Sequence, residues 1–292
     1  MPQEETPVVV SIINLKGGVG KTTLAVMLAR HAASRVFDLD VLAVDLDPQA
    51  NLSQALLQRG YEKIMDPKNP SCSIVELFKG FAPPSRGKPG PSKLKTSAVV
   101  QRVRDKLDVL PSRFDFSDNL IESARVDETV LANFIRSHMT HKDLVLIDCA
   151  PTESILTRTA YHASGYILVP VKPELFSTVG FPLMKESLDQ FRSRNRGNEI
   201  KVKGVLINHP DYGPRPSPHH QKALSEIRRY ASIYDWPILN NAMSYSRGYP
   251  KYMAEPSPLH PGKAAGEQSA ICREILQSLG FSRKQRIPAT DK

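Results

Sequence analysis

A glycine-rich stretch with two lysines and two threonines is the part of this sequence whose residue types best suit phosphate binding. It spans residues 15–23 and reads Leu-Lys-Gly-Gly-Val-Gly-Lys-Thr-Thr. Glycines let a backbone turn tightly and bring its N–H groups against phosphate oxygens, and a helix that starts there adds further donors and a partial positive charge. We therefore predict that this stretch binds a nucleotide. The predicted contacts are Gly17, Gly18, Val19, Gly20, Lys21, Thr22 and Thr23.

Individual roles in this stretch follow from its side chains. Lys21 is predicted to reach the β- and γ-phosphates, and the Thr22 hydroxyl to bind Mg²⁺. The stretch departs from the common phosphate-loop motif twice, because Leu15 stands where the motif has its first glycine and Lys16 adds a second cation. A glycine-rich turn can also join a strand to a helix without binding nucleotide. The combination of glycines, both lysines and Thr22 favours the nucleotide.

Three aspartates follow apolar runs of the kind that form buried strands. Asp45 and Asp47 come at the end of one run, and Asp148 ends another. In an open parallel sheet, ligands bind beyond the carboxyl ends of the strands, so these carboxylates are predicted to face the loop at Lys21. We expect Asp148 to hold Mg²⁺ through a water molecule, Asp47 to orient the water that attacks a γ-phosphate, and Asp45 to support the Mg²⁺ ligands.

The elements that must position these residues alternate between strand and helix patterns along the chain. Apolar, β-branched runs predict strands, and amphipathic or short-branched runs predict helices. The predicted strands are residues 8–13, 41–44, 107–111, 142–148, 166–174 with the exit from the strand included, 201–208 and 235–239. The predicted helices are residues 24–29, 74–78, 117–138, 176–191, 217–232 and 264–279. This alternation predicts a single α/β domain over residues 1–292, with a doubly wound, mostly parallel sheet of about seven strands and helices on both faces.

Two basic segments interrupt this alternation or follow it. Residues 82–97 are rich in proline and glycine and contain several cations, which predicts a flexible basic loop. Such a loop can be simply solvated, or it can contact DNA or a partner protein electrostatically, with Lys88, Lys93 and Lys95 as the candidates. The tail, residues 281–292, is also basic and is predicted to be disordered.

Composition narrows the class of protein. The net charge is +9, which is compatible with a polyanionic partner or with solubility alone. There is no run of 18 apolar residues and the acidic N-terminus has no apolar core, so we expect neither stable membrane insertion nor a signal peptide. The three cysteines are isolated and no Cys-x-x-Cys pair occurs, which argues against a disulfide framework, a zinc site or an iron–sulfur site within one chain. These features predict a cytoplasmic protein.

Three motifs together resemble the ParA/MinD family of ATPases, whose phosphate loop is a deviant Walker A motif. They are residues 15–23, 45–53 and 144–152, and the resemblance extends from about residue 8 to residue 279. It fits best the plasmid and chromosome partition ParA proteins of the short type, without an N-terminal helix-turn-helix domain. The resemblance implies a slow ATPase that uses Mg²⁺ and converts ATP and water to ADP and phosphate. Lys16, Lys21 and Asp47 are then the candidate catalytic residues.

The resemblance gives two residues roles that their position alone does not. In the family, the lysine equivalent to Lys16 crosses to the nucleotide of a second subunit, which implies a homodimer in the ATP-bound state with its two loops face to face. The alternative is that Lys16 touches only its own phosphates. Asn208 ends a predicted strand, and the resemblance implies that it reads the adenine edge, since an amide can both donate and accept. The alternative is an asparagine that only makes a turn.

The resemblance also implies partners. The family binds duplex DNA nonspecifically, associates with the bacterial nucleoid, and is activated by a ParB-type or adaptor protein, while the cargo can be a plasmid, a chromosome or another body. Two departures concern the DNA surface. Residues 82–97 are longer and more basic than the usual segment, and residues 241–250 follow the family pattern only loosely, with Arg247 as the nearest candidate for a DNA-binding arginine.

Other functions of the same fold remain as alternatives. A MinD-like membrane-cycling ATPase would need an amphipathic C-terminal helix, whereas residues 281–292 contain Pro288 and little apolar area. A metal-cluster reductase would need two suitable cysteines per subunit, and we interpret Cys149 as a small buried residue. An amidoligase or kinase would need a pocket for an acceptor substrate.

Overall fold

One sheet carries the residues that the sequence marks for phosphate chemistry. The computed structural model describes residues 6–66, 73–80, 96, 99–116, 127–174, 177–209, 217–246, 248–254 and 263–284. In these ranges seven strands pair in the order β3-β4-β2-β5-β1-β6-β7, with β3 and β4 antiparallel and the other pairs parallel. The predicted α/β class and the mostly parallel sheet are therefore confirmed.

The element bounds are as follows. The strands are β1 (Val8–Ile12), β2 (Val41–Leu46), β3 (Gln101–Arg104), β4 (Leu107–Leu110), β5 (Leu144–Cys149), β6 (Tyr166–Val171) and β7 (Lys201–Ile207). The helices are α1 (Lys21–Ala32), α2 (Asn51–Leu57), η1 (Gln58–Gly60), α3 (Tyr61–Ile64), α4 (Ile74–Gly80), α6 (Val130–His138), α7 (Ile155–Ala163), α8 (Ser177–Arg194), α9 (Pro218–Ile233), α10 (Gly248–Ala254) and α11 (Lys263–Ser278).

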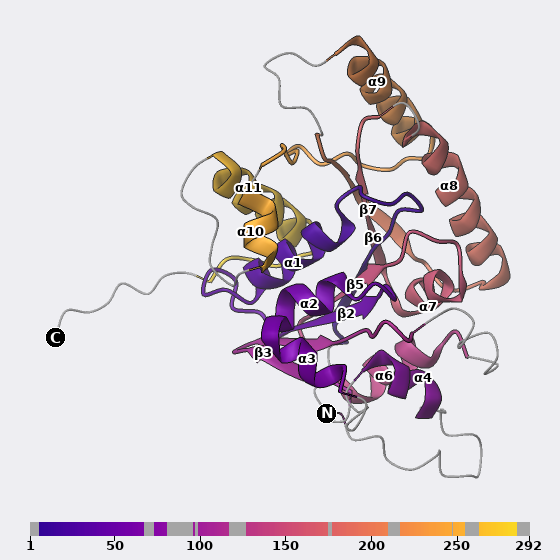
Figure 1. Cartoon of the computed structure of the whole chain (residues 1–292). Helices are drawn as coiled ribbons and strands as arrows, with labels where there is room; N and C mark the ends of the chain where they lie inside the picture. The colour runs from indigo at the N-terminus through magenta and orange to yellow at the C-terminus, as the bar shows by residue number, and fades with distance from the viewer. Residues whose placement is uncertain are drawn as a thin grey trace.

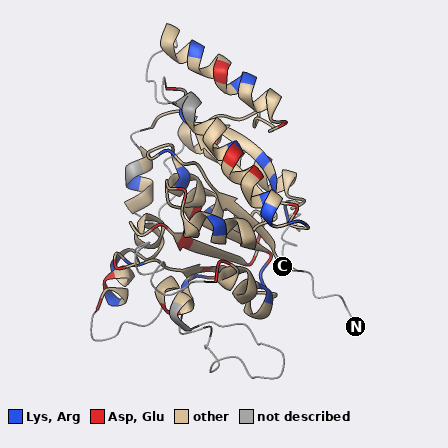
Figure 2. Ribbon diagram, turned by 90° about the vertical axis from the view of Figure 1, so that its right-hand side faces the viewer, with Lys and Arg blue, Asp and Glu red and all other residues tan. Residues whose placement is uncertain are grey.

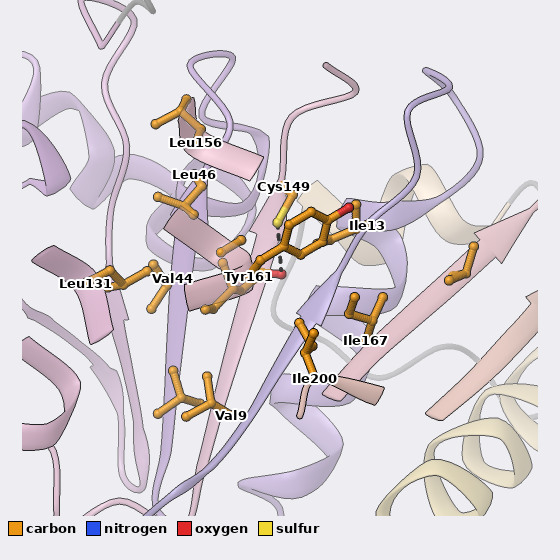
Figure 3. Packing of buried hydrophobic residues seen from close by; sticks show 14 of the residues in the cluster. Val9, Ile13, Val44, Leu46, Leu131, Cys149, Leu156, Tyr161, Ile167 and Ile200 are labelled. Atoms are coloured by element: carbon orange, nitrogen blue, oxygen red, sulfur yellow. Dashed lines mark hydrogen bonds between the residues drawn. The ribbon is translucent and has the colours of Figure 1, made fainter. Parts of the chain in front are cut away.

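Helices cover both faces of the sheet (Figure 1). Helices α1, α10 and α11 lie on one face, and α6, α7 and α8 lie on the other, so that each face has its own apolar cluster. Strands β2 and β5 are buried at every residue, which explains why their sequences are continuous apolar runs that end in aspartate rather than alternating patterns. Figure 3 shows the second face, where Cys149 packs among Leu156 and Tyr161. Cys149 is 1% exposed, which confirms its interpretation as a small buried residue.

A buried arginine ties three helices together next to the predicted site. Arg30 in α1 donates to the carbonyl of Ala55 in α2 at 2.8 Å and to the carbonyl of Tyr252 in α10 at 2.6 Å. Its guanidinium also lies 4.8 Å from the centroid of the Tyr252 ring. Burial lowers the pKa of Arg30, although the Tyr252 side chain acts in the opposite direction. Helix α2, which follows Asp47, is thus linked to α10.

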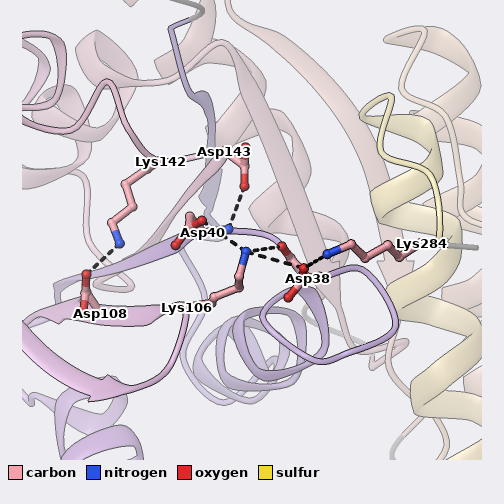
Figure 4. Close-up of polar contacts among 7 residues, drawn as sticks. All are labelled: Asp38, Asp40, Lys106, Asp108, Lys142, Asp143 and Lys284. Carbon is pink, nitrogen blue, oxygen red and sulfur yellow. Dashed lines mark hydrogen bonds and ion pairs between the residues drawn. The ribbon is translucent and has the colours of Figure 1, made fainter. Parts of the chain in front are cut away.

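Ionic contacts fasten the connections at the amino ends of the strands (Figure 4). The Lys106 ammonium lies 3.4 Å from Asp40 Oδ2 and 3.6 Å from Asp38 Oδ2. Lys284, which follows α11, pairs with the same Asp38 carboxylate, and its backbone N–H donates to the carbonyl of Val36 at 3.0 Å. The chain from α11 is therefore attached through Lys284, and residues 285–292 of the predicted disordered tail lie outside the described residues.

The structure corrects some predicted elements. Residues 235–239 do not form a strand, because only an isolated bridge joins Ile238 to Val205; Pro237, which has no N–H group, precedes it. The sequence also missed β3, in which Val103 is the single apolar residue, and the helices α2, α3, α7 and α10. By contrast, the predicted start of α9 is confirmed, since the Ser217 hydroxyl accepts from the N–H of His220 at 3.2 Å and proline follows at the first position.

Other sequence predictions fall largely or partly on undescribed residues. Residues 117–126 of the helix predicted over 117–138 lie outside the described ranges. The described part of that prediction, residues 127–138, contains helix α6. Apart from residue 96, the predicted basic loop at residues 82–97 also lies outside them. Among the described helices, none is both long and apolar enough to cross a membrane.

Candidate phosphate-binding site

The loop between β1 and α1 has the backbone geometry that phosphate binding requires. Gly18 has φ +70° and Gly20 has φ +99°, values that side chains other than glycine rarely allow. Gly20 also occupies the N-cap position of α1, where no side chain caps the helix, and the first turn contains no acidic residue. The first N–H groups of α1 are thus left for an anion at the carboxyl end of the sheet.

A second segment closes on the loop at Gly20. The Asn208 side chain donates to the carbonyl of Val19 at 3.0 Å. A methyl group added at Gly20 would lie 2.7 Å from the Asn208 amide nitrogen and 3.2 Å from the end of Met243. The glycine is therefore required here both for its φ angle and for this close approach. In the described structure Asn208 braces the loop, and adenine recognition by this residue stays a prediction.

Helix α11 holds the segment that carries Met243. Glu274 accepts hydrogen bonds from the backbone and side-chain N–H groups of Asn240 and Asn241 at 2.6 to 2.9 Å. Partial burial raises the pKa of Glu274, but these donors outweigh it and leave the pKa below its usual value. Glu267 accepts from the backbone and the hydroxyl of Ser244. Met243 in turn pairs with Asn208, so α11 positions this side of the loop.

Lys21 points inward. Its ammonium donates to the carbonyls of Asn14 and Lys16, both at 3.0 Å, and the residue is 7% exposed. Burial lowers the pKa of Lys21, and the nearby Asp148 and Asp47 carboxylates act in the opposite direction. The ammonium is therefore desolvated and bonded to neutral carbonyl acceptors. Phosphate oxygens could replace these carbonyls and form stronger, charge-assisted hydrogen bonds with the ammonium.

Lys16 points outward from the same loop. Its ammonium lies 2.8 Å from Oε2 of Glu174, and the two side chains are 30% and 41% exposed. Glu174 follows strand β6, so this ion pair joins the loop to the end of a neighbouring strand. The sequence predicted both lysines for the site, but not that they point in different directions.

Asp148 and Asp45 lie side by side on β5 and β2, as partners in the strand register. Both oxygens of Asp148 are buried and have no hydrogen-bond partner in the described part of the chain. Burial, and then the neighbouring Asp45, raise the pKa of Asp148 well above its usual value, while the Thr22 hydroxyl and Lys21 act in the opposite direction. An orphaned carboxylate beside a threonine hydroxyl suits a divalent cation, which would remove this penalty.

The oxygens of Asp45 are already occupied. Oδ1 accepts from the N–H of Asp47 at 3.1 Å, and Oδ2 accepts from the N–H and hydroxyl of Ser53 at 2.8 and 2.6 Å. Burial raises the pKa of Asp45 to about 7, although the Ser53 hydrogen bonds lower it. Asp45 thus shapes the turn that carries Asp47, and its expected support of Mg²⁺ would be indirect.

Asp47 follows strand β2, and its role in orienting water stays a prediction. Its Oδ1 accepts from the N–H of Gln49 at 2.9 Å, and the residue is 8% exposed. Within the described ranges no group of three His, Cys, Asp or Glu side chains is arranged to hold a metal ion. A cation here would therefore be held by Thr22, Asp148, water and the phosphates themselves. A cavity of about 400 Å³ adjoins Thr22 and is lined by Asn51, Gln54, Ala55, Met253 and Ala254.

Sequence reasoning missed Asn14, Glu174 and Ser53. Asn14 could have been found, because an asparagine two residues before a turn residue often accepts its N–H group. Glu174 and Ser53 carry no local signal, because their partners, Lys16 and Asp45, are not at a spacing that predicts a contact.

The residues predicted for DNA, Arg247, Lys88, Lys93 and Lys95, all lie outside the described residues. Figure 2 shows lysine and arginine on the outer surfaces of several helices.

Comparisons with known proteins agree with the fold and with the family that the motifs resemble. The family model described as AAA domain matches residues 8–202. The uncharacterized protein MJECL24 of Methanocaldococcus jannaschii is 32% identical over 224 residues, which cover 76% of this chain and 80% of that protein. The chromosome partitioning protein ParA of Caulobacter vibrioides is 27% identical over 281 residues, covering 92% and 93%. A solved ATP complex of Cyanothece McdA superposes with a TM-score of 0.77 at 18% identity, over 97% of this chain and 100% of that one.

Proposed function

The chain belongs to the AAA domain family of ParA-type partition ATPases, and we propose that it is an ATP-dependent dimer switch. In this proposal the chain binds ATP with Mg²⁺, dimerises, binds duplex DNA nonspecifically, and hydrolyses ATP to release both. The switch partitions or positions a plasmid, a chromosome or another cargo, and a ParB-type or adaptor protein stimulates it. The protein would act in the cytoplasm, on the nucleoid.

The opposite orientations of the two loop lysines carry this proposal. Lys21 is 7% exposed and bonded to the carbonyls of its own loop, where phosphates would bind. The Lys16 side chain is 30% exposed and reaches the outer rim at Glu174. A lysine that contacts only the phosphates bound to its own subunit would be expected to point into the phosphate loop, as Lys21 does. A cation at the rim can meet the phosphates of a second subunit across a two-fold axis.

Hydrolysis would depend on charge neutralisation and on a positioned water. Lys21 and the N–H groups of the loop would hold the phosphate oxygens. Mg²⁺, when bound, would neutralise charge on the β- and γ-phosphates, and Thr22 and Asp148 are the residues placed to hold it. Asp47 would orient the attacking water. Because a carboxylate beside phosphate and Mg²⁺ stays ionised, its role is to accept a hydrogen bond and not to remove a proton.

The DNA-binding part of the proposal is supported by the net charge of +9 and by the family. Contacts to phosphates release counterions, so the binding should weaken steeply with salt and depend little on sequence. The membrane-cycling alternative is not favoured. The described part of the tail, Phe281 to Lys284, is not helical, and Phe281 packs partly against the core.

The first test compares ATP hydrolysis, with and without duplex DNA, in the wild type and two lysine variants. We expect Lys21→Ala to abolish nucleotide binding. We expect Lys16→Ala to keep nucleotide binding by the monomer but to lose hydrolysis and the ATP-dependent dimer. Lys201→Ala is the matched control, since Lys201 is an exposed lysine at the other end of the sheet that pairs only weakly with Glu199.

Two results would overturn the proposal. Full activity and normal dimerisation of Lys16→Ala would remove the switch between subunits. Failure of the ATP-loaded wild type to bind any duplex at low salt would remove the DNA function while leaving the ATPase in place. Binding that is equal with and without ATP would also contradict the switch, because DNA affinity must then be independent of the nucleotide.

A further inference from the structure

Asn14 is a buried side chain at the junction of β1 and the phosphate loop, and it bonds in two directions. Its amide nitrogen donates to the carbonyl of Pro170 in β6 at 2.8 Å, and its side-chain oxygen accepts from the N–H of Lys16 at 2.9 Å. The residue is 6% exposed. Its own carbonyl also accepts from the Lys21 ammonium at 3.0 Å. One residue thus contacts both lysines of the loop and a neighbouring strand.

The bond to Pro170 takes the place of a backbone hydrogen bond that is absent between β1 and β6. The pairing of β1 with β6 continues past Ile12, since the N–H of Ile13 donates to the carbonyl of Leu168 at 3.0 Å. In a parallel ladder the next donor would be the N–H of Leu15, opposite the carbonyl of Pro170. The chain leaves the sheet at that point to form the loop. The Asn14 amide fills the vacated position, and the loop stays fastened to β6.

The bond between Asn14 and Pro170 sets the position from which the Lys16 side chain extends. The N–H of Lys16 is held by Asn14, and its ammonium is held by Glu174. Both partners are tied to the end of β6, because Asn14 bonds to Pro170 and Glu174 follows that strand. A shift of the first loop turn relative to β6 would therefore displace the whole Lys16 side chain. The Lys21 side chain, by contrast, extends from α1, whose position depends on helix packing.

We propose that Asn14 is a positioning residue for Lys16, which fastens the first turn of the loop to β6 and so directs the Lys16 ammonium toward the second subunit. The inference rests on the proposed function, in which Lys16 acts on a partner's nucleotide. It predicts a specific pattern: loss of Asn14 should impair the steps that need Lys16 and should spare binding of ATP to the monomer, which needs Lys21.

The test uses two substitutions that separate the local turn from the bond to β6. In Asn14→Ser, the hydroxyl can still accept from the N–H of Lys16 but is too short to reach Pro170. In Asn14→Ala, both contacts are lost. Ser11→Ala is the matched control, because it removes another buried hydrogen bond of β1, the 2.5 Å contact with Ser164, away from the loop. For each protein we would measure thermal stability, affinity of the monomer for a fluorescent ATP analogue, hydrolysis at saturating ATP, and dimerisation with a non-hydrolysable ATP analogue.

We expect both Asn14 variants to lose hydrolysis and dimerisation by about tenfold or more, while ATP affinity of the monomer changes by less than about threefold. The control should lose stability but keep hydrolysis and dimerisation. In a Lys16→Ala background, replacing Asn14 should leave the ATP affinity of the monomer unchanged, because that step needs Lys21 and not Lys16. These results together would separate positioning of Lys16 from a general loosening of the loop.

Several results would overturn the inference without affecting the proposed function. If Asn14→Ser behaves like the wild type, the bond to Pro170 has no positioning role. If the ATP affinity of the monomer falls as much as hydrolysis does, or if it falls when Asn14 is replaced in the Lys16→Ala background, Asn14 does not act through Lys16. If Lys16→Ala itself dimerises and hydrolyses normally, the proposed function fails first, and that result is visible without any Asn14 variant.

Discussion

The ammonium of Lys16 lies 2.8 Å from Oε2 of Glu174 in the same chain. The lysine that we propose to act on a second subunit is thus paired within its own subunit. For Lys16 to reach a partner's phosphates, this ion pair must open. The free energy of opening reduces the fraction of molecules that are ready to dimerise.

Replacing Glu174 should make dimerisation easier. We expect Glu174→Gln to lower the ATP concentration at half-maximal dimerisation by roughly 1.5- to 5-fold, the range that partly exposed ion pairs contribute. Sedimentation in an ATP series measures this directly. Glu199→Gln is the control, since Glu199 also pairs with a lysine but lies at the other end of the sheet. Weaker dimerisation of Glu174→Gln would instead assign Glu174 to the dimer contact.

Glycine substitutions should separate two neighbouring positions of the loop. Gly20→Ala would strain a backbone at φ +99° and bring a methyl group to 2.7 Å from the Asn208 amide, so we expect a loss of stability of about 1 to 3 kcal/mol and loss of nucleotide binding. At Gly17 nothing lies within 4 Å of an added methyl group. Gly17→Ala should therefore keep the stability of the ligand-free protein in urea unfolding. Equal stability losses would contradict the structure of the loop.

Asp148 should lower the stability of the folded protein while supporting Mg²⁺-dependent hydrolysis. Its pKa is raised by burial, so the folded protein holds this proton to a higher pH than the unfolded chain, and ionisation destabilises the fold as pH rises above about 4. Asp148→Asn removes that ionisation. Without Mg²⁺ or ATP, we expect the variant to be more stable than the wild type at pH 8 by at least about 1 kcal/mol, and this advantage to shrink toward pH 4.

The same variant should lose Mg²⁺-dependent hydrolysis, because a neutral amide holds the cation and its waters less well. Thermal unfolding at several pH values, combined with hydrolysis at increasing Mg²⁺ concentration, checks both halves. An Asp148→Asn protein that is less stable than the wild type by the same amount at pH 5 and pH 8 would show that ionisation of Asp148 is not the source of the penalty.

A histidine pair should make stability depend on pH in the opposite direction. The Nδ1 of His209 lies 3.0 Å from Nε2 of His220. Burial, and then His220, lower the pKa of His209, while Glu267 acts in the opposite direction. The unfolded chain therefore binds more protons below its ordinary pKa of about 6.5, and stability falls as pH decreases through that value. Between pH 7.5 and 5.5 we expect His209→Gln to lose about 1 to 2 °C less in Tm than the wild type. An identical slope would contradict this.

The sequence predicts the parts of the site that depend on local pattern. A buried parallel strand must be apolar on both faces, and a phosphate loop needs glycine at defined positions, so β1, β2, β5 and the loop could be located from residues alone. The sequence also predicts that the aspartates at the ends of β2 and β5 lie near Lys21, because the carboxyl ends of parallel strands meet at one edge of the sheet. The structure brings them together there, with Asp45 and Asp148 as direct neighbours.

The remaining features depend on contacts between distant parts of the chain. Glu174 and Lys16 are far apart in the sequence, and neither residue type demands the other. The same holds for Asn14 and Pro170, whose bond follows from the register of β1 against β6. Residues 235–239 have a strand-like composition, but they touch the edge of β7 at a single bridge. Local propensity cannot fix how far such an edge contact extends.

The contact of Lys284 with Asp38 has a practical consequence for single-molecule work. Asp38 precedes β2, at the amino ends of the parallel strands, whereas the phosphate loop lies at their carboxyl ends. The described chain therefore leaves the domain on the side away from the nucleotide. A fluorophore or surface tether joined through the C-terminal residues would start from that side, so immobilised molecules would keep the loop, Lys16 and the proposed dimer face turned toward solution.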